Sequence, residues 1–248
     1  MALLIFSCSC NKQAKTPEAI VPARALNAQG VGLASYMLKD DIDTLAVGQP
    51  ALIQPDHALQ LLHLDFIVSA KKYEADYEAN EIAADKKYKS KKIVIYGKVV
   101  SINKDALGDG FITLLSDQPI GVQAFLSGEG SDGAADVQKS KTISLVCDPG
   151  GRTLGLESAR NCVLFSQYLA HLHPNFDDIV TGVLTGRLAI PKDIAEAITF
   201  GYVIGTDLPS DSKCVSVSHE GCEEAMAKME KAQIGAQVTK ELQFVKTN

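Results

Sequence analysis

The sequence predicts an α+β protein in which an amphipathic helix precedes a five-stranded β-barrel, with mostly helical N- and C-terminal extensions. Two observations lead to this fold class. The spacing of apolar residues changes from helical to alternating near residue 93, and short strand-like segments separated by turn residues then continue to residue 164. With 248 residues and 46% hydrophobic content, the chain can bury a core as one large domain or two small ones.

The helix expected before the barrel spans residues 69–87. Tyr73, Tyr77 and Ala84 fall near one stripe of this helix, while glutamates occupy its other surfaces. Lys86 and Lys87 lie in its last turn, where positive charge complements the helix dipole. We interpret the tyrosine stripe as packing rather than as a ligand site.

The barrel strands begin with a long segment, Ile93 to Asn103, in which Gly97 permits a bulge or a sharp bend. The remaining elements are expected as strands at 111–115, 121–126, 142–147 and before Leu164, turns at 105–110 and 148–153, and a short helix at 134–139. This order is the layout of an OB-fold, a Greek-key barrel: a bent long strand, two strands, a short helix and two further strands.

The helical extensions are expected on both sides of the barrel. Asp56 is placed to cap a helix that begins at residue 57, and Pro191 precedes a plausible helix at 192–205. The expected organisation is residues 1–22 as signal remnant, lipid anchor and tether, 23–67 as N-terminal helical extension, 68–165 as OB-fold domain, and 166–248 as mostly helical C-terminal region.

The N-terminus, MALLIFSCSC, resembles the end of a bacterial lipoprotein signal, in which a small residue precedes the cysteine that is lipidated. Cys8 is the expected lipidation site, and Cys10 is the alternative because Ser9 precedes it. The apolar run is short and lacks a basic start, which a start codon placed too late would explain. These features predict an envelope protein anchored to a membrane by acyl chains. The alternative is a frayed apolar terminus on a cytoplasmic protein.

A second resemblance lies at the junction of helix and barrel. The residues that carry it are Tyr77, Asn80, Ala83, Ala84, Asp85, Tyr88, Lys89 and Lys91, then IVIYGKVVSI, and later the ending L-x-x-A-R-N-C-V-L. Over about residues 68–165 the chain resembles the tRNA-anti-like family of small bacterial envelope proteins, often lipoproteins. The resemblance implies an OB-fold, and nucleic-acid binding has been suggested for the family.

The six cysteines fall into the pairs Cys8 and Cys10, Cys147 and Cys162, and Cys214 and Cys222. In the expected barrel, Cys147 and Cys162 lie on neighbouring strands, and a bridge between them would add roughly 3 kcal/mol by the loop-entropy model. Cys214 and Cys222 can form a local bridge. The alternative is that these cysteines are buried thiols. Their spacings match no zinc motif, so we expect no metal site.

The lysines at 86–92 raise the question of nucleic-acid binding, but the net charge of −6 argues against a protein that coats nucleic acid. Strand alternation sends Lys89 and Lys91 to one side and Lys92 to the other, which leaves few cations on any one surface. The ligand-binding candidates from parity and residue type are Tyr96, Lys98, Phe125, Lys89 and Lys91.

No catalytic motif is evident, since the chain lacks G-x-S-x-G, H-E-x-x-H and a phosphate loop. We therefore expect no enzyme activity and no cofactor. The predicted function is a binding module of a lipid-anchored envelope protein, with an unknown protein, peptide, glycan or small-molecule ligand. The alternative is a single-stranded nucleic-acid binding protein, which would need a basic groove with stacking aromatics.

Overall fold

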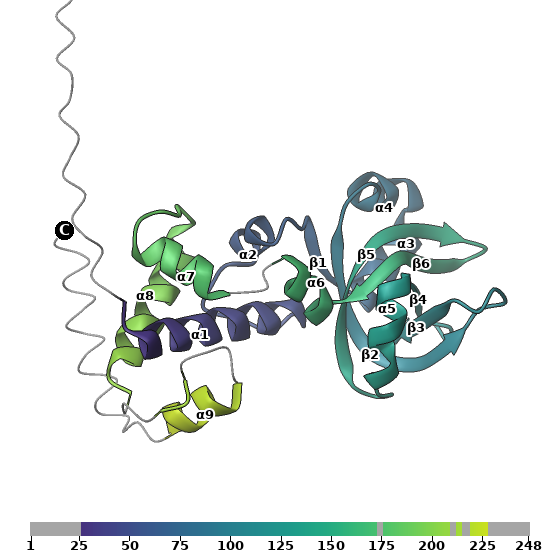
Figure 1. Ribbon diagram of the computed structural model, residues 1–248. Coiled ribbons are helices and arrows are strands. Elements are labelled where there is room, and N and C mark those ends of the chain that lie inside the picture. Colours follow the sequence, from purple (N-terminus) through teal and green to yellow (C-terminus); the bar gives the residue numbers. More distant parts are fainter. Residues whose placement is uncertain (1–25, 173–175, 209–211, 215–218, 228–248) are drawn as a thin grey trace, which may run out of the picture.

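The computed structural model describes residues 26–172, 176–208, 212–214 and 219–227, and it places a β-barrel at one end and a group of helices at the other (Figure 1). The elements in chain order are α1 (Ala28–Ala46), α2 (Pro55–Leu61), β1 (Phe66–Ser69), α3 (Ala70–Ala79), α4 (Glu81–Tyr88), β2 (Ile93–Lys104), β3 (Gly110–Leu114), β4 (Val122–Leu126), α5 (Gly128–Gly133), the 3₁₀ helix η1 (Ala134–Asp136), β5 (Thr142–Thr153), β6 (Leu156–Leu164), α6 (Phe165–Leu172), α7 (Phe176–Leu184), α8 (Lys192–Thr206) and α9 (His219–Ala227).

Strands β2 to β6 form a closed barrel. The pairing order is β2-β3-β4-β6-β5, and β5 pairs back with β2, which closes the ring. All of these pairs are antiparallel except β4 with β6, which run parallel. This strand order and the helix α5 between β4 and β5 confirm the predicted OB-fold and the α+β class. A short strand that the sequence pattern does not predict, β1, runs parallel to β2.

The long strand β2 bends because it changes partners along its length. Residues Ile93 to Lys98 pair with β5, whereas Val99 to Lys104 pair with β3. The irregularity in pairing falls between Val99 and Ser101, two residues beyond the predicted site at Gly97. Gly97 has another use: a Cβ there would lie 3.2 Å from the Cβ of Ala70. The glycine therefore lets helix α3 approach the strand closely.

The predicted helix at 69–87 is two helices, α3 and α4. Asn80 has an extended backbone (φ −166°, ψ 100°), which ends α3, and its side chain accepts a hydrogen bond from the N–H of Ala83 to cap α4. Helical periodicity continues through the break, so it did not reveal the break. Lys86 and Lys87 do lie in the last turn of α4.

Of two other local predictions, one was displaced along the chain and one was wrong. The helix expected at 134–139 lies earlier, at α5 and η1, because Ser127 caps α5 and the glycine-rich segment packs tightly on β6. A Cβ on Gly130 would lie 2.2 Å from the carbonyl oxygen of Cys162. The expected turn at 148–153 is strand, since β5 pairs with β6 as far as Thr153. The hairpin turn itself is Leu154-Gly155, and both residues have positive φ.

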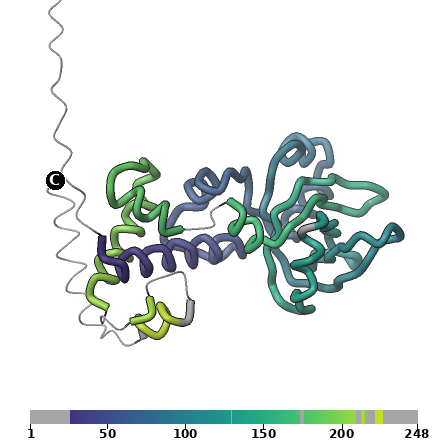
Figure 2. The backbone as a smooth tube through the Cα atoms, viewed as in Figure 1, coloured from purple at the N-terminus to yellow at the C-terminus, as the bar shows by residue number. Residues whose placement is uncertain are grey.

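The helices from the two ends of the chain pack together beside the barrel. Figure 2 shows α1, from the start of the described chain, lying alongside α8, from near its end. The two helices are in close contact at Gly201, where a Cβ would lie only 2.8 Å from the Cα of Ala34. The shared core also takes in Val94 and Val146 from the barrel. Helix α2 begins at Pro55 with Gln54 as its cap, so Asp56 lies in the first turn instead of capping.

Candidate functional site

The outer surface of β3 and β4 carries a pair of aromatic side chains. Phe111 and Phe125 lie opposite each other in the strand register, with ring centroids 5.5 Å apart and ring planes inclined by 34°. Their neighbours Ile112 and Ala124 are fully buried in the barrel core. Alternation along the strands therefore turns both phenylalanines outward, where they are partly exposed. The two rings form a small aromatic platform.

Uncharged polar side chains surround this platform. The hydroxyl of Ser101 donates to the hydroxyl of Thr113 over 3.0 Å, and the amide of Asn103 donates to Ser101 over 2.8 Å. Gln123 lies opposite Thr113 in the register, and its side chain has no hydrogen-bond partner among the described residues. The amide of Gln123 is thus available to a ligand. The β3–β4 face comprises Ser101, Asn103, Phe111, Thr113, Gln123, Phe125, Ser158 and Arg160.

Two hairpin tips at the end of the barrel away from the helices carry exposed leucines (Figure 1). Leu107 lies between β2 and β3 and is 88% exposed, and Leu154 lies between β5 and β6 and is 98% exposed. Leu154 also has a φ of 54°, which costs a non-glycine residue roughly 1–2 kcal/mol. These loops correspond to the two that frame the ligand face in OB-folds.

The sequence candidates are distributed over different surfaces. Phe125 lies on the β3–β4 face, whereas Tyr96 belongs to the part of β2 that pairs with β5. A Cβ on Gly48 would lie 2.1 Å from the hydroxyl oxygen of Tyr96, so this tyrosine packs against the chain that follows α1. Lys98 is exposed on the same half of β2. Tyr96 and Lys98 are therefore not part of the platform around Phe125.

The lysine-rich segment is largely occupied by ion pairs with aspartates. The ammonium group of Lys91 lies 2.9 Å from Asp65, and that of Lys92 lies 3.7 Å from Asp148. Hydrogen bonds from the Lys92 N–H and from Lys91 lower the pKa of the Asp65 carboxyl. Lys89 is exposed at the end of α4 and has no ion-pair partner among the described residues. The segment does not form a continuous basic surface.

The tyrosines of α3 and α4 close one end of the barrel. Tyr73, Tyr77 and Tyr88 are all buried in the barrel core, and their rings contact one another with centroids 5.0 to 6.2 Å apart. Their hydroxyls donate to the carbonyl of Ser158, to Asp85 and to Asp76 respectively. Burial raises the pKa of Tyr73 to about 12. The stripe is packing, as the sequence analysis proposed.

The same helix α3 also holds the loop between β3 and β4. Glu74 is buried and its carboxylate accepts hydrogen bonds from the hydroxyl of Ser116, over 2.5 Å, and from the N–H groups of Asp117 and Gln118. Buried carboxylates need such donors, since an unpaired buried charge is costly. Glu74 therefore positions the loop at one edge of the β3–β4 face.

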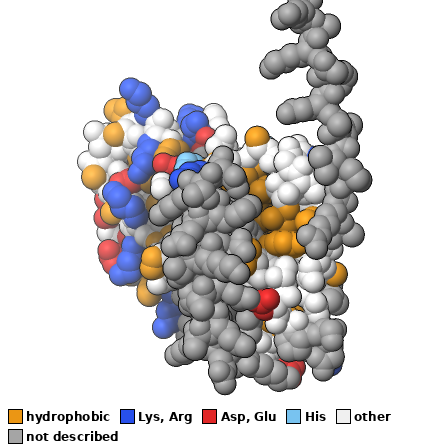
Figure 3. Space-filling model, turned by 90° about the vertical axis from the view of Figure 1, so that its left-hand side faces the viewer, with side chains coloured by type: hydrophobic (Ala, Val, Ile, Leu, Met, Phe, Trp, Pro, Cys, Tyr) orange, Lys and Arg blue, Asp and Glu red, His pale blue; other side chains and the backbone are white. Residues whose placement is uncertain are grey.

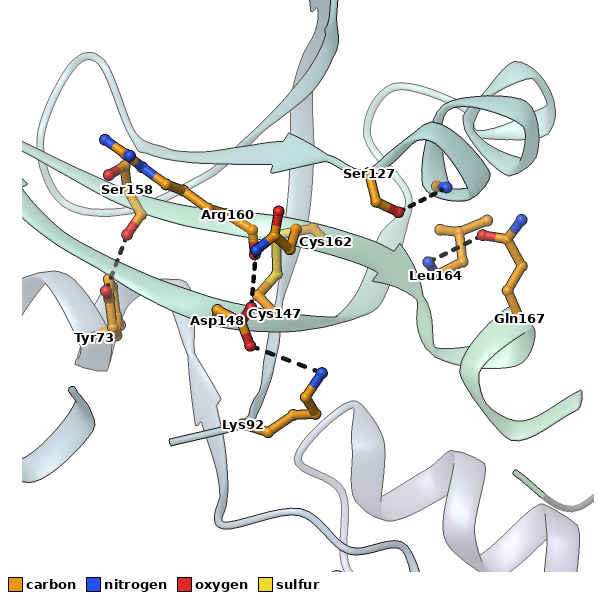
Figure 4. The surroundings of a disulfide bond; sticks show 12 residues. Tyr73, Lys92, Ser127, Cys147, Asp148, Ser158, Arg160, Cys162, Leu164 and Gln167 are labelled. Atoms are coloured by element: carbon orange, nitrogen blue, oxygen red, sulfur yellow. Dashed lines mark hydrogen bonds and ion pairs between the residues drawn. A yellow bond between two sulfur atoms is a disulfide. The ribbon is translucent and has the colours of Figure 1, made fainter. Parts of the chain in front are cut away.

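Both predicted cysteine bridges are present. The Cys147–Cys162 disulfide joins β5 to β6 inside the barrel core (Figure 4), and Cys214–Cys222 joins the chain before α9 to that helix. In the same view, the side chain of Arg160 extends along β6 toward Ser158. Arg160 is exposed and has no ion-pair partner among the described residues. The β6 end of the β3–β4 face thus carries one cation.

The predicted lipidation sites, Cys8 and Cys10, lie outside the described residues. Within the described part of the chain, no helix combines the length and the apolar character needed to cross a membrane. The described residues likewise contain no group of three or more His, Cys, Asp or Glu side chains arranged to hold a metal ion.

A hollow of about 600 Å³ lies at the junction of the helices and the barrel. It is lined by Leu45, Ile67, Tyr96 and the segment 48–55. Leu52 at its edge is 65% exposed. Figure 3 views the molecule from the end at which the helices lie, and among the coloured side chains visible there, basic and acidic groups are interspersed.

Sequence reasoning missed Phe111, Gln123 and Arg160. Strand alternation could have identified Phe111. If Ile112 and Leu114 face the core, alternation turns Phe111 outward, as it does Phe125 on the neighbouring strand. Gln123 has the same parity as Phe125. Arg160 is placed beside them only by the parallel pairing of β4 with β6, which joins strands that are distant in sequence.

A closed OB barrel with an aromatic and polar outer face defines a binding module of the OB class. More specifically, the chain belongs to the tRNA_anti-like family, which matches residues 12–158, more than half of its length. This match confirms the resemblance seen in the sequence. No curated protein matches the chain.

Among solved structures, a Klebsiella pneumoniae subsp. pneumoniae protein proposed to be a nucleic acid-binding lipoprotein is similar at 13% identity with a TM-score of 0.35. The superposition covers 45% of this chain and 98% of that one. Its proposed ligand and lipid anchor are properties of that protein.

Proposed function

We propose that the chain is a non-enzymatic binding module of a bacterial envelope lipoprotein, and that its ligand binds on the β3–β4 face. The observation that carries the proposal is the outward-facing pair Phe111 and Phe125 on the two strands that OB-folds use for ligands. Two exposed leucines at the hairpin tips flank the same end of the barrel. Aromatic rings that remain partly exposed at a fixed spacing are suited to stacking on a planar or ring-shaped ligand.

The envelope location rests on separate support. Disulfides persist in oxidising compartments, and the chain forms two of them, one inside the barrel core. The Ser-Cys pattern at residues 7–10 resembles a lipoprotein signal. A lipid anchor followed by a tether at about residues 11–22 would hold the folded part near a membrane surface.

Single-stranded nucleic acid is the second candidate ligand, favoured by the aromatic pair, since bases stack on such rings. The lysines give it little support. Lys87, Lys91 and Lys92 each lie within ion-pair distance of an aspartate, so they are not free to replace the counterions of a phosphate backbone.

An NMR titration of the ¹⁵N-labelled full chain tests the binding face. The probes are tetra-N-acetylchitotetraose, cellotetraose, the oligonucleotide (dT)₈ and a mixture of unstructured octapeptides. We expect at least one probe to shift amide signals of β3 and β4 in a saturable way, and Phe125→Leu to weaken that binding about 10-fold because the aromatic face is lost.

The matched control is Ile82→Ala on α4, whose side chain is 84% exposed and lies outside the β3–β4 face. It should leave the binding unchanged. If no probe shifts the β3 and β4 signals, or if the shifts survive in Phe125→Leu, this face is not the binding site.

A further inference from the structure

The charge of the β3–β4 face distinguishes among ligands. The segments that build it, 103–113, 123–125 and 158–160, contain two cations, Lys104 and Arg160, and two carboxylates, Asp105 and Asp109. The formal charge of these segments is therefore zero, and Arg160 is the one charged residue among the eight that define the face. A strong nucleic-acid binder neutralises several phosphates with lysines and arginines, typically six or more in salt-dependent complexes. The face lacks the charge complementarity that a polyanion requires.

The polar groups of the face suit a ligand rich in hydroxyls. Gln123 presents an amide with two donors and an acceptor, and Asn103 presents an amide of which one N–H already donates to the hydroxyl of Ser101. The Ser101 hydroxyl in turn donates to the buried hydroxyl of Thr113. Gln123 has no side-chain partner among the described residues. Sugar hydroxyls both donate and accept, so uncharged amides and hydroxyls can pair with them without leaving a buried charge unpaired.

The aromatic pair complements this polar row. The faces of a sugar ring present C–H groups, which are apolar and slightly positive, to the negative face of an aromatic ring. Phe111 and Phe125 offer two such rings with centroids 5.5 Å apart. That spacing is comparable to the length of one hexose unit, so one or two consecutive sugars can contact both rings.

Closure of the barrel disfavours an extended peptide on this face. Strand β3 pairs with β2 and β4, and strand β4 pairs with β3 and β6. Neither strand therefore has a free edge at which a peptide could add as a further strand through its main chain. A ligand of these strands has to be recognised by side chains alone.

We infer that the ligand of the β3–β4 face is an uncharged oligosaccharide segment, stacked on Phe111 and Phe125 and hydrogen-bonded by Asn103 and Gln123. This inference rests on the proposed function and names the ligand class for the same site. OB-folds bind oligosaccharides as well as oligonucleotides on the corresponding strands. The low charge of the face, with Arg160 as its one cation, and its uncharged amides and hydroxyls favour an oligosaccharide over an oligonucleotide.

The test compares tetrasaccharides that are matched in length and differ in charge, together with an oligonucleotide. The full chain is titrated with tetra-N-acetylchitotetraose and cellotetraose, which are neutral, with tetragalacturonate, which is anionic, and with (dT)₈, each at 20 mM and 200 mM NaCl. We expect saturable binding of at least one neutral tetrasaccharide, with a Kd that changes less than 2-fold between the two salt concentrations. At 200 mM NaCl, the anionic probes should bind at least 10-fold more weakly than that neutral tetrasaccharide.

Three variants separate stacking and hydrogen bonding from folding. Phe125→Leu and Gln123→Ala should each weaken the neutral sugar about 10-fold, whereas Phe125→Tyr should retain it because the aromatic face is kept. Similar amide spectra would show that all three remain folded.

The possible results distinguish the inference from the proposed function. Preferential, salt-dependent binding of (dT)₈ or tetragalacturonate on β3 and β4 would overturn the oligosaccharide and keep the binding face. Binding of the octapeptides alone on this face would likewise overturn the oligosaccharide and keep the binding face. Absence of any shift on β3 and β4 with all probes would overturn both.

Discussion

Asp76 connects the two helices that close the barrel. Its carboxylate accepts hydrogen bonds from Tyr88, over 2.6 Å, from Lys87, over 2.9 Å, and from Lys72. Burial alone would raise the pKa of Asp76, but the hydrogen bonds from Lys72, Tyr88 and Lys87 outweigh it and lower the pKa to about 2. Asp76 is on α3, while Tyr88 and Lys87 are on α4, so one side chain holds the two helices across the break at Asn80.

Asp76→Asn should reduce the free energy of unfolding by about 2 kcal/mol at pH 7, because the folded-state pKa lies about two units below the value of roughly 3.9 in the unfolded chain. Since the folded-state pKa of Asp76 is depressed, its contribution to the free energy of unfolding is fully present above about pH 4 and is lost as the pH falls through 2. Urea denaturation of the wild type and the variant at pH 7, 4 and 2.5 measures this difference.

The matched control is Asp117→Asn, which removes only the exposed ion pair with Lys71. Its unfolding curve should coincide with that of the wild type, since exposed pairs contribute little. A difference between Asp76→Asn and the wild type that stays constant down to pH 2.5 would contradict the titration of Asp76 as its cause.

Most residues of the motif that carries the family resemblance are explained by closure of the barrel. Tyr77 and Tyr88 fill the core, Asp85 accepts from Tyr77, Asn80 caps α4, and Lys91 pairs with Asp65. These roles are structural, so the motif identifies the fold but not the ligand. The candidate ligand groups, Phe111 and Phe125, lie outside that motif.

At the scale of elements, the junction of β5 and β6 is held by a covalent bond where the hydrogen-bonded pairing is irregular. The register shifts between Val146 and Asp148, and Cys147 lies at that shift. The bridge to Cys162 spans 15 residues, and both cysteines are at most 1% exposed. The disulfide therefore fastens the two strands at a point where the β-ladder alone is interrupted.

Cys147→Ala/Cys162→Ala should lower the free energy of unfolding by about 3 kcal/mol, because a loop of 15 residues is no longer constrained in the unfolded chain. Urea denaturation measures the loss, and hydrogen exchange of the β5 and β6 amides locates it. Cys214→Ala/Cys222→Ala removes the same number of bridges from the helical end, and it should leave the exchange of β5 and β6 unchanged. Equal protection of these strands in both variants would contradict a role for the core bridge.

At the scale of the whole molecule, the two flanks of the barrel depend on each other. Helix α1 packs against α8 through small residues, since a Cβ on Gly205 would lie 2.7 Å from the Cα of Gly30 and one on Gly30 would lie 2.7 Å from the ring of Tyr202. The joint between helices and barrel includes a hydrogen bond of 2.7 Å from the hydroxyl of Ser144 to the carbonyl of Ala46. In Figure 1, the hairpin tips point away from α1, at the far end of the molecule.

The proposed anchor can be tested on the whole protein in cells. Expressed from the gene with its upstream region, the wild type should take up a radiolabelled acyl chain and fractionate with membranes, whereas Cys8→Ala should be unlabelled and soluble. Cys10→Ala is the matched control and should stay labelled. Loss of label in Cys10→Ala but not in Cys8→Ala would place the lipidation site at Cys10. A soluble, unlabelled wild type would contradict the proposed anchor.

The barrel and its strand order could be predicted from the sequence because alternation, turn residues and cysteine spacing are local signals. Ile112, Leu114, Val122 and Ala124 follow that alternation into the core, and Phe125 follows it outward. A bend of β2 was predicted at Gly97, but the pairing irregularity lies between Val99 and Ser101, and the position of α5 was also missed, since both depend on contacts with distant segments. The break at Asn80 had a local signal, because asparagine is a favoured helix N-cap. Gly97 approaches Ala70, and Gly130 approaches Cys162.

Alternation, turn residues and cysteine spacing were enough to predict the fold class, to favour the two cysteine pairs over buried thiols, and to interpret the tyrosine stripe as packing. Only the tertiary structure decided which of the candidate residues meet. It set Phe111 against Phe125 through the β3–β4 register and brought Arg160 beside them through parallel pairing with β6. It also separated Tyr96, Lys89 and Lys91 from that face. The physical reason is that closing a barrel joins strands far apart in the chain, which no local pattern records.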